Sequence, residues 1–180
     1  MKTWPAKTLL LIAAATACFA ASSESRVSRA SILAMEDAIN AKFRVNSPDP
    51  WDLLGTARGT YLEGYGVVFT WELQLVFVSP PSPFNPKISE ADVAQVHERK
   101  LKKIPQLKEA MRSLMLAACN SLPGLPPEER VSMEAILWNY SWENSRGMPR
   151  RVFMSVEKQK LLDAQAAHTD LALVIEEQER

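Results

Sequence analysis

Cysteines are scarce in this chain, and motifs for catalysis are missing. The two cysteines among 180 residues are Cys18 and Cys119, and Cys18 lies in a segment that we expect to be removed or lipidated. Cys119 would then have no thiol partner within the chain, which excludes a structural disulfide. The sequence also shows no glycine-rich phosphate loop, serine-centred elbow, HExxH motif or paired-cysteine metal site. We therefore expect no catalytic residue, no metal and no cofactor.

An excess of charge of one sign is also missing. Lysine and arginine total 21, as do aspartate and glutamate, so the formal net charge is 0. Loss of Lys2 and Lys7 with an N-terminal signal would leave 19 basic against 21 acidic residues. This balance gives no long-range attraction to phosphate backbones, so we expect no nucleic-acid partner.

The N-terminal residues have the pattern of a secretory signal. Lys2 and Lys7 flank the start of an apolar segment at residues 9–17, and small residues follow at Cys18 and Ala20. The apolar segment is too short to remain in a bilayer as a spanning helix. We predict that residues 1–20 are removed and that the mature protein is extracytoplasmic, either periplasmic, at the cell surface or secreted.

Cys18 allows a second interpretation of the same segment. The sequence Ala15-Thr16-Ala17-Cys18 resembles a permissive form of the lipobox of bacterial lipoproteins. The resemblance implies cleavage before Cys18 and attachment of lipid to its thiol. In that case the lipid would be the protein's contact with the membrane.

Residues 56–78 have the clearest periodicity in the chain. From Val67 to Phe77 every second residue is large and apolar, while several of the residues between are polar. This alternation predicts a strand with one buried face.

The preceding glycines predict how this strand is paired. Gly64 and Gly66 can adopt positive φ, so the segment reads as a β-hairpin. With the turn centred on Tyr65, Arg58 lies opposite Glu72. We predict a structural ion pair between these two side chains.

Two helices should flank this hairpin. Apolar residues at spacings of three and four predict an amphipathic helix at residues 28–43. After a proline-rich segment at residues 79–86, Ser89 is the expected N-cap of a longer helix, which Pro105 should bend or split. The basic run at residues 99–103 fits a solvated helix face, or a surface for anionic lipid headgroups or an acidic partner.

A second hairpin completes the expected fold. Residues 131–142 alternate in polarity, and a loop returns the chain to a strand at residues 151–156. We predict an α+β two-layer sandwich, in which an antiparallel sheet of two hairpins, about four strands, is covered by the long proline-bent helix, with further helices at the N- and C-terminal ends. A tether at residues 21–31 would precede a single domain at residues 32–167, and residues 168–180 would form a frayed acidic tail.

Three aromatic residues form the most distinctive candidate surface. Trp138, Tyr140 and Trp142 would share one strand face, at intervals of about 7 Å. Such rings could stack on sugars or insert into a partner, or they could form a second core layer under a terminal helix.

Paired carboxylates are the candidate for an enzyme. Glu72 and Glu134 could share the outer sheet face and act as general acid and base, as glycoside hydrolysis requires. Their spacing in the sequence does not require the two carboxylates to lie close together.

The predicted signal and the lack of catalytic motifs lead to one expectation and two alternatives. We expect an exported, non-enzymatic module that binds a protein partner or scaffolds the cell envelope. The first alternative is a carbohydrate-binding module that uses Trp138, Tyr140 and Trp142. The second is a hydrolase that uses Glu72 and Glu134.

Overall fold

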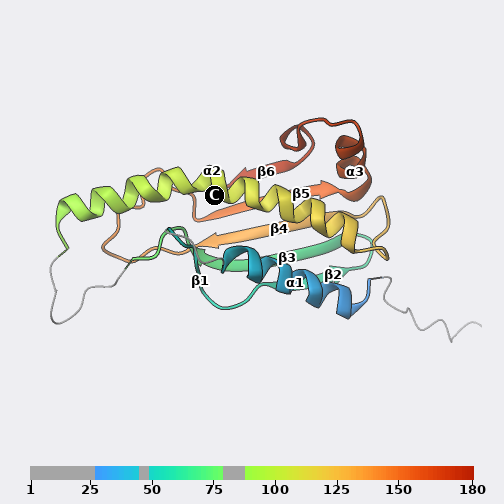
Figure 1. Cartoon of the computed structure of the whole chain (residues 1–180), viewed down its shortest axis with the longest axis horizontal. Helices are drawn as coiled ribbons and strands as arrows, with labels where there is room; N and C mark the ends of the chain where they lie inside the picture. The colour runs from blue at the N-terminus through green and yellow to red at the C-terminus, as the bar shows by residue number, and fades with distance from the viewer. Residues whose placement is uncertain (1–26, 45–48, 79–87) are drawn as a thin grey trace, which may run out of the picture.

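The structure is a computed structural model that describes residues 27–44, 49–78 and 88–180 (Figure 1). The predicted signal, Cys18 and the proline-rich segment lie outside these ranges. The helices are α1 (Arg29–Phe43), α2 (Glu90–Ser121) and α3 (Lys158–Ala166), with a 3-10 helix η1 (Leu171–Leu173). The strands are β1 (Asp52–Leu53), β2 (Arg58–Leu62), β3 (Gly66–Gln74), β4 (Arg130–Leu137), β5 (Arg151–Glu157) and β6 (Glu176–Glu179).

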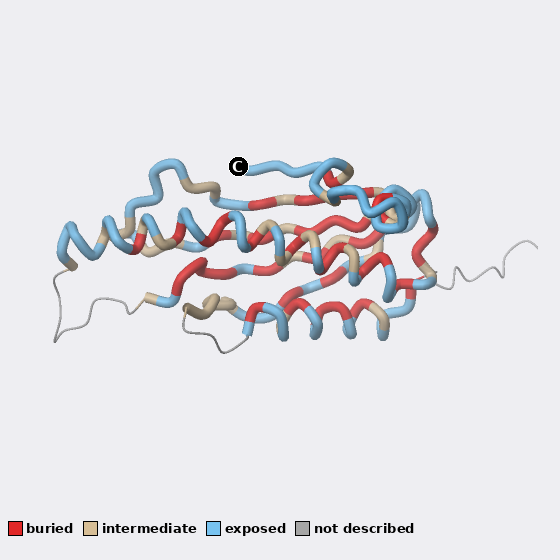
Figure 2. Tube along the Cα trace, turned by 45° about the horizontal axis from the view of Figure 1, so that its top comes forward, coloured by how far each residue is buried: buried red, intermediate tan, exposed pale blue. Residues whose placement is uncertain are grey.

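The fold is α+β with two layers, as the sequence predicts. One layer is a sheet, and the other is formed by α1 and α2, which lie against the same face of that sheet (Figure 1). Phe69, Trp71 and Leu73 of β3 point into the core and are at most 2% exposed. Figure 2 shows that buried residues gather where the strands face the two helices. The predicted alternation is therefore confirmed along β3.

The sheet is mixed and has six strands, instead of the predicted antiparallel sheet of about four. Its order is β1-β3-β4-β5-β6, and β2 also pairs with β3. The β3–β4 pair is parallel, whereas all other pairs are antiparallel. The length of α2 explains this, because its 32 residues extend about 48 Å and carry the chain back to the end of the sheet where β3 begins.

The first hairpin forms in a register that differs by two residues from the predicted one. Leu62 pairs with Gly66, so the turn is centred on Gly64, whose φ of +78° is accessible to glycine. Arg58 consequently pairs with Thr70 and not with Glu72. The predicted Arg58–Glu72 pair is wrong for this reason.

Both predicted helices that flank the hairpin are present. Helix α1 begins at Arg29, and Val27 before it is already buried, so ordered structure starts inside the expected tether at residues 21–31. Ser89 caps α2 through a reciprocal pair of hydrogen bonds with Asp92. Pro105 does not split α2, which continues as one helix to Ser121.

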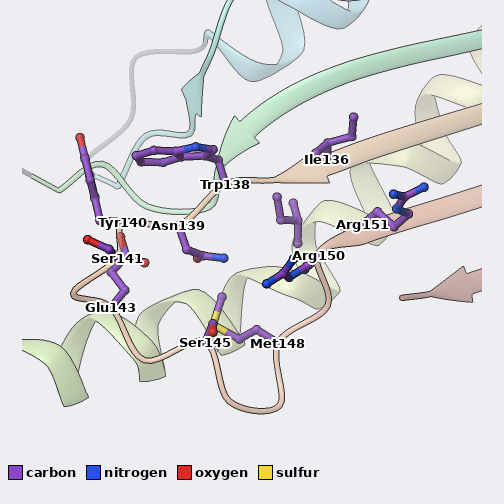
Figure 3. Close-up of a pocket in the computed structure, with 11 residues that line it drawn as sticks. Ile136, Trp138, Asn139, Tyr140, Ser141, Glu143, Ser145, Met148, Arg150 and Arg151 are labelled. Atoms are coloured by element: carbon purple, nitrogen blue, oxygen red, sulfur yellow. The ribbon is translucent and has the colours of Figure 1, made fainter.

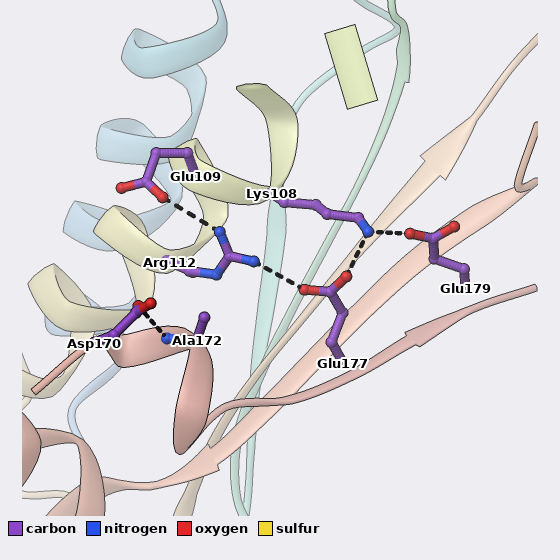
Figure 4. A network of polar contacts seen from close by, with 7 residues as sticks. All are labelled: Lys108, Glu109, Arg112, Asp170, Ala172, Glu177 and Glu179. Carbon is purple, nitrogen blue, oxygen red and sulfur yellow. Dashed lines mark hydrogen bonds and ion pairs between the residues drawn. The ribbon is translucent and has the colours of Figure 1, made fainter. Parts of the chain in front are cut away.

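The C-terminal residues form β6, which corrects the prediction of a frayed tail at residues 168–180. Its four residues are all exposed, and ion pairs hold it to α2 (Figure 4). Lys108 binds Glu177 at 2.5 Å and also binds Glu179. Arg112 binds Glu177 at 3.1 Å. The acidic composition that suggested fraying is what pairs this strand with basic residues of α2.

Cys119 of α2 is fully buried. Burial raises the pKa of this thiol from 9.0 to about 11, although Lys158 acts in the opposite direction. Between these pH values the thiol is protonated in the folded chain and ionised in the unfolded chain. Its contribution to the free energy of unfolding is therefore present below pH 9 and is lost as the pH rises to about 11.

We expect the folded protein to resist iodoacetamide at pH 8 and the urea-unfolded protein to react readily, since the thiolate is the nucleophile. The unfolding free energy of the wild type should also fall, relative to that of Cys119→Ala, by as much as about 2 kcal/mol across this alkaline window. Urea unfolding at several pH values measures this difference. Parallel pH profiles for the two proteins would contradict the prediction.

Candidate functional site

The three aromatic residues lie in a loop that follows β4, not on a strand face. β4 ends at Leu137, which is the last residue that pairs with β3. The Trp138 amide still donates to the Leu73 carbonyl at 3.0 Å, but beyond it no described strand pairs with the chain. The prediction extended the strand to Trp142, because alternation in the sequence continues after the neighbouring strands have ended.

The three rings form one contiguous cluster. Trp138 and Tyr140 meet edge to face with their centroids 4.5 Å apart, and Tyr140 stacks on Trp142 at 5.8 Å. Trp138 is 42% exposed, whereas Tyr140 and Trp142 are half-buried. The alternative of a second core layer therefore does not hold for Trp138. Its ring stands at the surface and is supported from one side by Tyr140.

Trp138 borders a cavity of about 500 Å³ between the end of β4 and the start of β5. Asn139, Ser145, Met148 and Arg150 also line it, and Figure 3 shows these side chains around a common space. Pockets for small ligands usually have volumes of about 300–1,000 Å³. The size of this cavity is therefore suited to a small molecule or to part of a chain molecule.

A buried ion pair between Lys100 and Glu143 lies beside this cavity. Lys100 of α2 donates to Glu143 and, at 2.8 Å, to the Asn139 Oδ1 atom. The Lys100 side chain is 0% exposed and that of Glu143 is 2% exposed. Burial lowers the pKa of Lys100, while the hydrogen bond and charge of Glu143 oppose that shift. The loop that carries the aromatic residues is thus fixed to α2 by charge.

The basic run at residues 99–103 is a solvated helix face only in part, because Lys100 and Lys103 point into the protein whereas Lys102 is exposed. Lys103 is buried, pairs with Asp49 at 3.1 Å and lies 4.7 Å from the centroid of the Trp51 ring. Arg99 pairs with the same carboxylate at 2.7 Å. The expectation of a surface for anionic lipid or an acidic partner does not hold for these residues.

Further hydrogen bonds fix the remainder of the loop. The Leu137 amide donates to the Arg150 carbonyl at 2.8 Å, which closes the loop at its base. His97 of α2 makes a 2.8 Å hydrogen bond through Nδ1 with the Asn144 carbonyl. Gly147 turns the chain with a φ of +72°. The cavity is consequently formed before any ligand binds.

Glu72 and Glu134 are on the same sheet face, the one opposite the helices, because Thr70 pairs with Glu134 and Glu72 pairs with Ile136. They do not share a cavity. Glu134 binds Arg151 at 3.2 Å and lines a hollow of about 210 Å³, whose lining does not include Glu72. The structure thus brings the two carboxylates to one face and places one of them in an ion pair.

Lys100, Asn139 and Glu143 are the site residues that the sequence interpretation missed. A signal was available for Lys100, because it lies four residues from both Val96 and Ile104 on the buried side of α2. A lysine at such a position needs an acidic partner. Nothing in the sequence identified Glu143 as that partner, since the two residues come from different elements.

Two kinds of feature are missing from the described residues, a metal-binding cluster and a membrane-spanning helix. No group of three or more His, Cys, Asp or Glu residues in residues 27–44, 49–78 and 88–180 could hold a metal ion. Within the same ranges, no helix has the length and apolar character to cross a bilayer. Comparisons of the chain with protein-family models, curated proteins and solved structures gave no match.

Proposed function

We propose that this chain is an exported, non-enzymatic module that binds carbohydrate in the cavity beside Trp138. The observation that carries the proposal is the Trp138 ring, which is 42% exposed and forms one wall of a cavity of about 500 Å³. The export part rests on the signal pattern at residues 1–20. Cys18 provides the site for a lipid anchor if cleavage occurs before it.

The chemistry of a sugar matches this lining. Pyranose rings have apolar C–H faces that pack on a flat aromatic side chain, and their hydroxyl groups need polar partners at the ring edge. Here the aromatic face comes from Trp138, and Asn139, Ser145 and Arg150 supply polar groups around the same space. The fixed loop also reduces the entropy cost of binding, because the site is already ordered.

The concave shape of the site favours carbohydrate over a protein partner. A stable protein–protein interface usually buries about 800 Å² on each partner. A few large side chains at the centre of this broad surface provide most of the binding energy. Trp138 instead borders a hollow bounded by the loop and the start of β5. Scaffolding of the envelope remains compatible with this role, because a module that binds cell-surface glycans can provide both.

We expect Trp138→Ala to weaken oligosaccharide binding at least tenfold, which corresponds to about 1.4 kcal/mol. Isothermal titration calorimetry with soluble tetrasaccharides, neutral and acidic, measures the affinity. The matched control is Phe77→Ala, since Phe77 is also an exposed aromatic residue but does not line the cavity. Undetectable binding of every tetrasaccharide, or equal affinities for wild type and Trp138→Ala, would refute carbohydrate binding at this site.

Export is tested separately, by mass spectrometry of the N-terminus of the mature protein. A chain that still carries residues 1–20 would contradict it.

A further inference from the structure

We infer that the ligand of this cavity carries a carboxylate, so that its chemical class is an acidic sugar, such as a chain of hexuronic acid. This inference rests on the proposed carbohydrate function and specifies its substrate. It follows from the orientation of one amide, the absence of a partner for one arginine, and the balance of charge around the cavity.

The Asn139 amide is oriented by the lysine beneath it. An ammonium group only donates hydrogen bonds, so Lys100 must face the Asn139 oxygen, as it does at 2.8 Å. The Nδ2 group, with two hydrogen-bond donors, is then directed elsewhere. Figure 3 shows the nitrogen of Asn139 on the side that faces Arg150. Asn139 thus offers donors to the cavity, and Lys100 prevents the amide from rotating to offer its oxygen.

Arg150 adds a second group of donors in the same region. Its guanidinium group makes no hydrogen bond or ion pair with any residue in the described part of the chain, whereas the neighbouring Arg151 binds Glu134 at 3.2 Å. The Arg150 backbone is fixed at both polar atoms, because its carbonyl accepts from the Leu137 amide at 2.8 Å and its amide donates to the main-chain oxygen of Arg180 at 2.6 Å. A guanidinium group presents parallel N–H donors that match the two oxygens of a carboxylate.

The charges around the cavity leave one positive charge without a counterpart. Lys100 is balanced by Glu143, and Arg151 is balanced by Glu134. Arg150 is the charged residue of the lining that has no side chain of opposite charge paired with it in the described part of the chain. An anionic group on the ligand would complete this balance, whereas a neutral sugar would leave the guanidinium group without a counter-ion.

Glu143 explains why the remainder of the ligand should carry hydroxyl groups. Its Oε1 atom is buried and has no hydrogen-bond partner, although the residue lines the cavity. Its negative charge is already matched by Lys100, so what this oxygen lacks is a neutral hydrogen-bond donor. A sugar hydroxyl is a neutral donor of suitable size. An acidic sugar therefore offers a carboxylate to Arg150 and Asn139, a hydroxyl to Glu143 and a ring face to Trp138.

The test compares tetramers of glucuronic acid and of glucose that have the same linkage, with affinities measured by isothermal titration calorimetry on the full chain. We expect the wild type to bind the glucuronic acid tetramer at least tenfold more tightly, because a hydrogen bond between two charged groups is stronger than one to a neutral hydroxyl group. Arg150→Gln should remove this preference, so that the variant binds the two tetramers with similar affinities. The matched control is Arg146→Gln, since Arg146 is an exposed arginine in the same loop that does not line the cavity.

The outcomes separate this inference from the proposed function. Equal affinities of the wild type for the two tetramers would overturn the acidic-sugar inference and leave carbohydrate binding intact. A preference that survives in Arg150→Gln, or that Arg146→Gln removes to the same extent, would also overturn it. Binding of neither tetramer would overturn both the inference and the function on which it rests.

Discussion

Replacing Glu143 with glutamine should lower the free energy of unfolding by about 3–5 kcal/mol, because the substitution leaves the Lys100 ammonium group without an opposite charge in a buried site. The two side chains are 0% and 2% exposed, so bulk solvent screens the remaining charge poorly. Urea unfolding followed by circular dichroism at pH 7 measures the loss.

The loss of unfolding free energy caused by Glu143→Gln should become smaller at alkaline pH. Burial already lowers the pKa of Lys100, and removal of the neighbouring negative charge lowers it further. Above this lowered pKa the unfolded chain binds a proton that the folded chain does not bind. The free energy of unfolding of the variant therefore rises with pH until the unfolded lysine also loses its proton near 10.5.

Glu109→Gln is the matched control for this substitution. Glu109 also pairs with a basic residue of α2, but its side chain is 77% exposed, so we expect a loss below about 1 kcal/mol. The double variant Lys100→Met with Glu143→Leu should regain much of the stability, because apolar side chains can replace a buried ion pair. A loss for Glu143→Gln as small as that for Glu109→Gln would show that the pair does not hold the loop.

Replacing Gly66 with alanine should be at least as damaging, with a loss of about 4 kcal/mol or a failure to fold. Gly66 has a φ of +130°, which residues with a side chain rarely adopt. A Cβ atom at this position would lie 2.0 Å from the Arg130 carbonyl oxygen and 2.5 Å from the Arg130 nitrogen. Both atoms belong to the backbone at the start of β4, so no side chain can rotate away to make room.

Gly64→Ala separates the cost of the backbone angle from that of the clash. Gly64 has a φ of +78°, but a Cβ atom there would meet nothing within 4 Å. We expect it to lose only about 1–2 kcal/mol, the usual cost of a left-handed conformation for a residue with a side chain. Urea unfolding of the two variants provides the comparison. Equal losses would contradict the conclusion that contact between β3 and β4 is what excludes a side chain at Gly66.

Much of the fold could be predicted because its local signals are strong. The alternation along β3, the cap at Ser89 and the amphipathic pattern of α1 depend on neighbours in the sequence. The parallel pairing of β3 with β4 is not a local feature of the sequence. It depends on the length of α2 compared with the length of the sheet. Strand β6 was also missed, because its four exposed polar residues show no apolar pattern, and Lys108 and Arg112 of α2 hold it in place.

The candidate site was predictable only in part. Trp138 was recognised as an unusual aromatic residue, because tryptophan in an alternating segment is visible in the sequence. Its exposure could not be inferred, since that depends on where the neighbouring strands end. The Lys100–Glu143 pair joins residues 43 positions apart, and only the tertiary fold brings them together.

The position of β4 has a consequence for the order in which the molecule can be assembled. This strand lies between β3 and β5 in the sheet, yet it begins only at residue 130 of 180. A nascent chain that ends before that residue can close its first hairpin but leaves one side of β3 without its partner. Because pairings between distant segments form slowly, the ribosome must complete most of the polypeptide before the sheet can close.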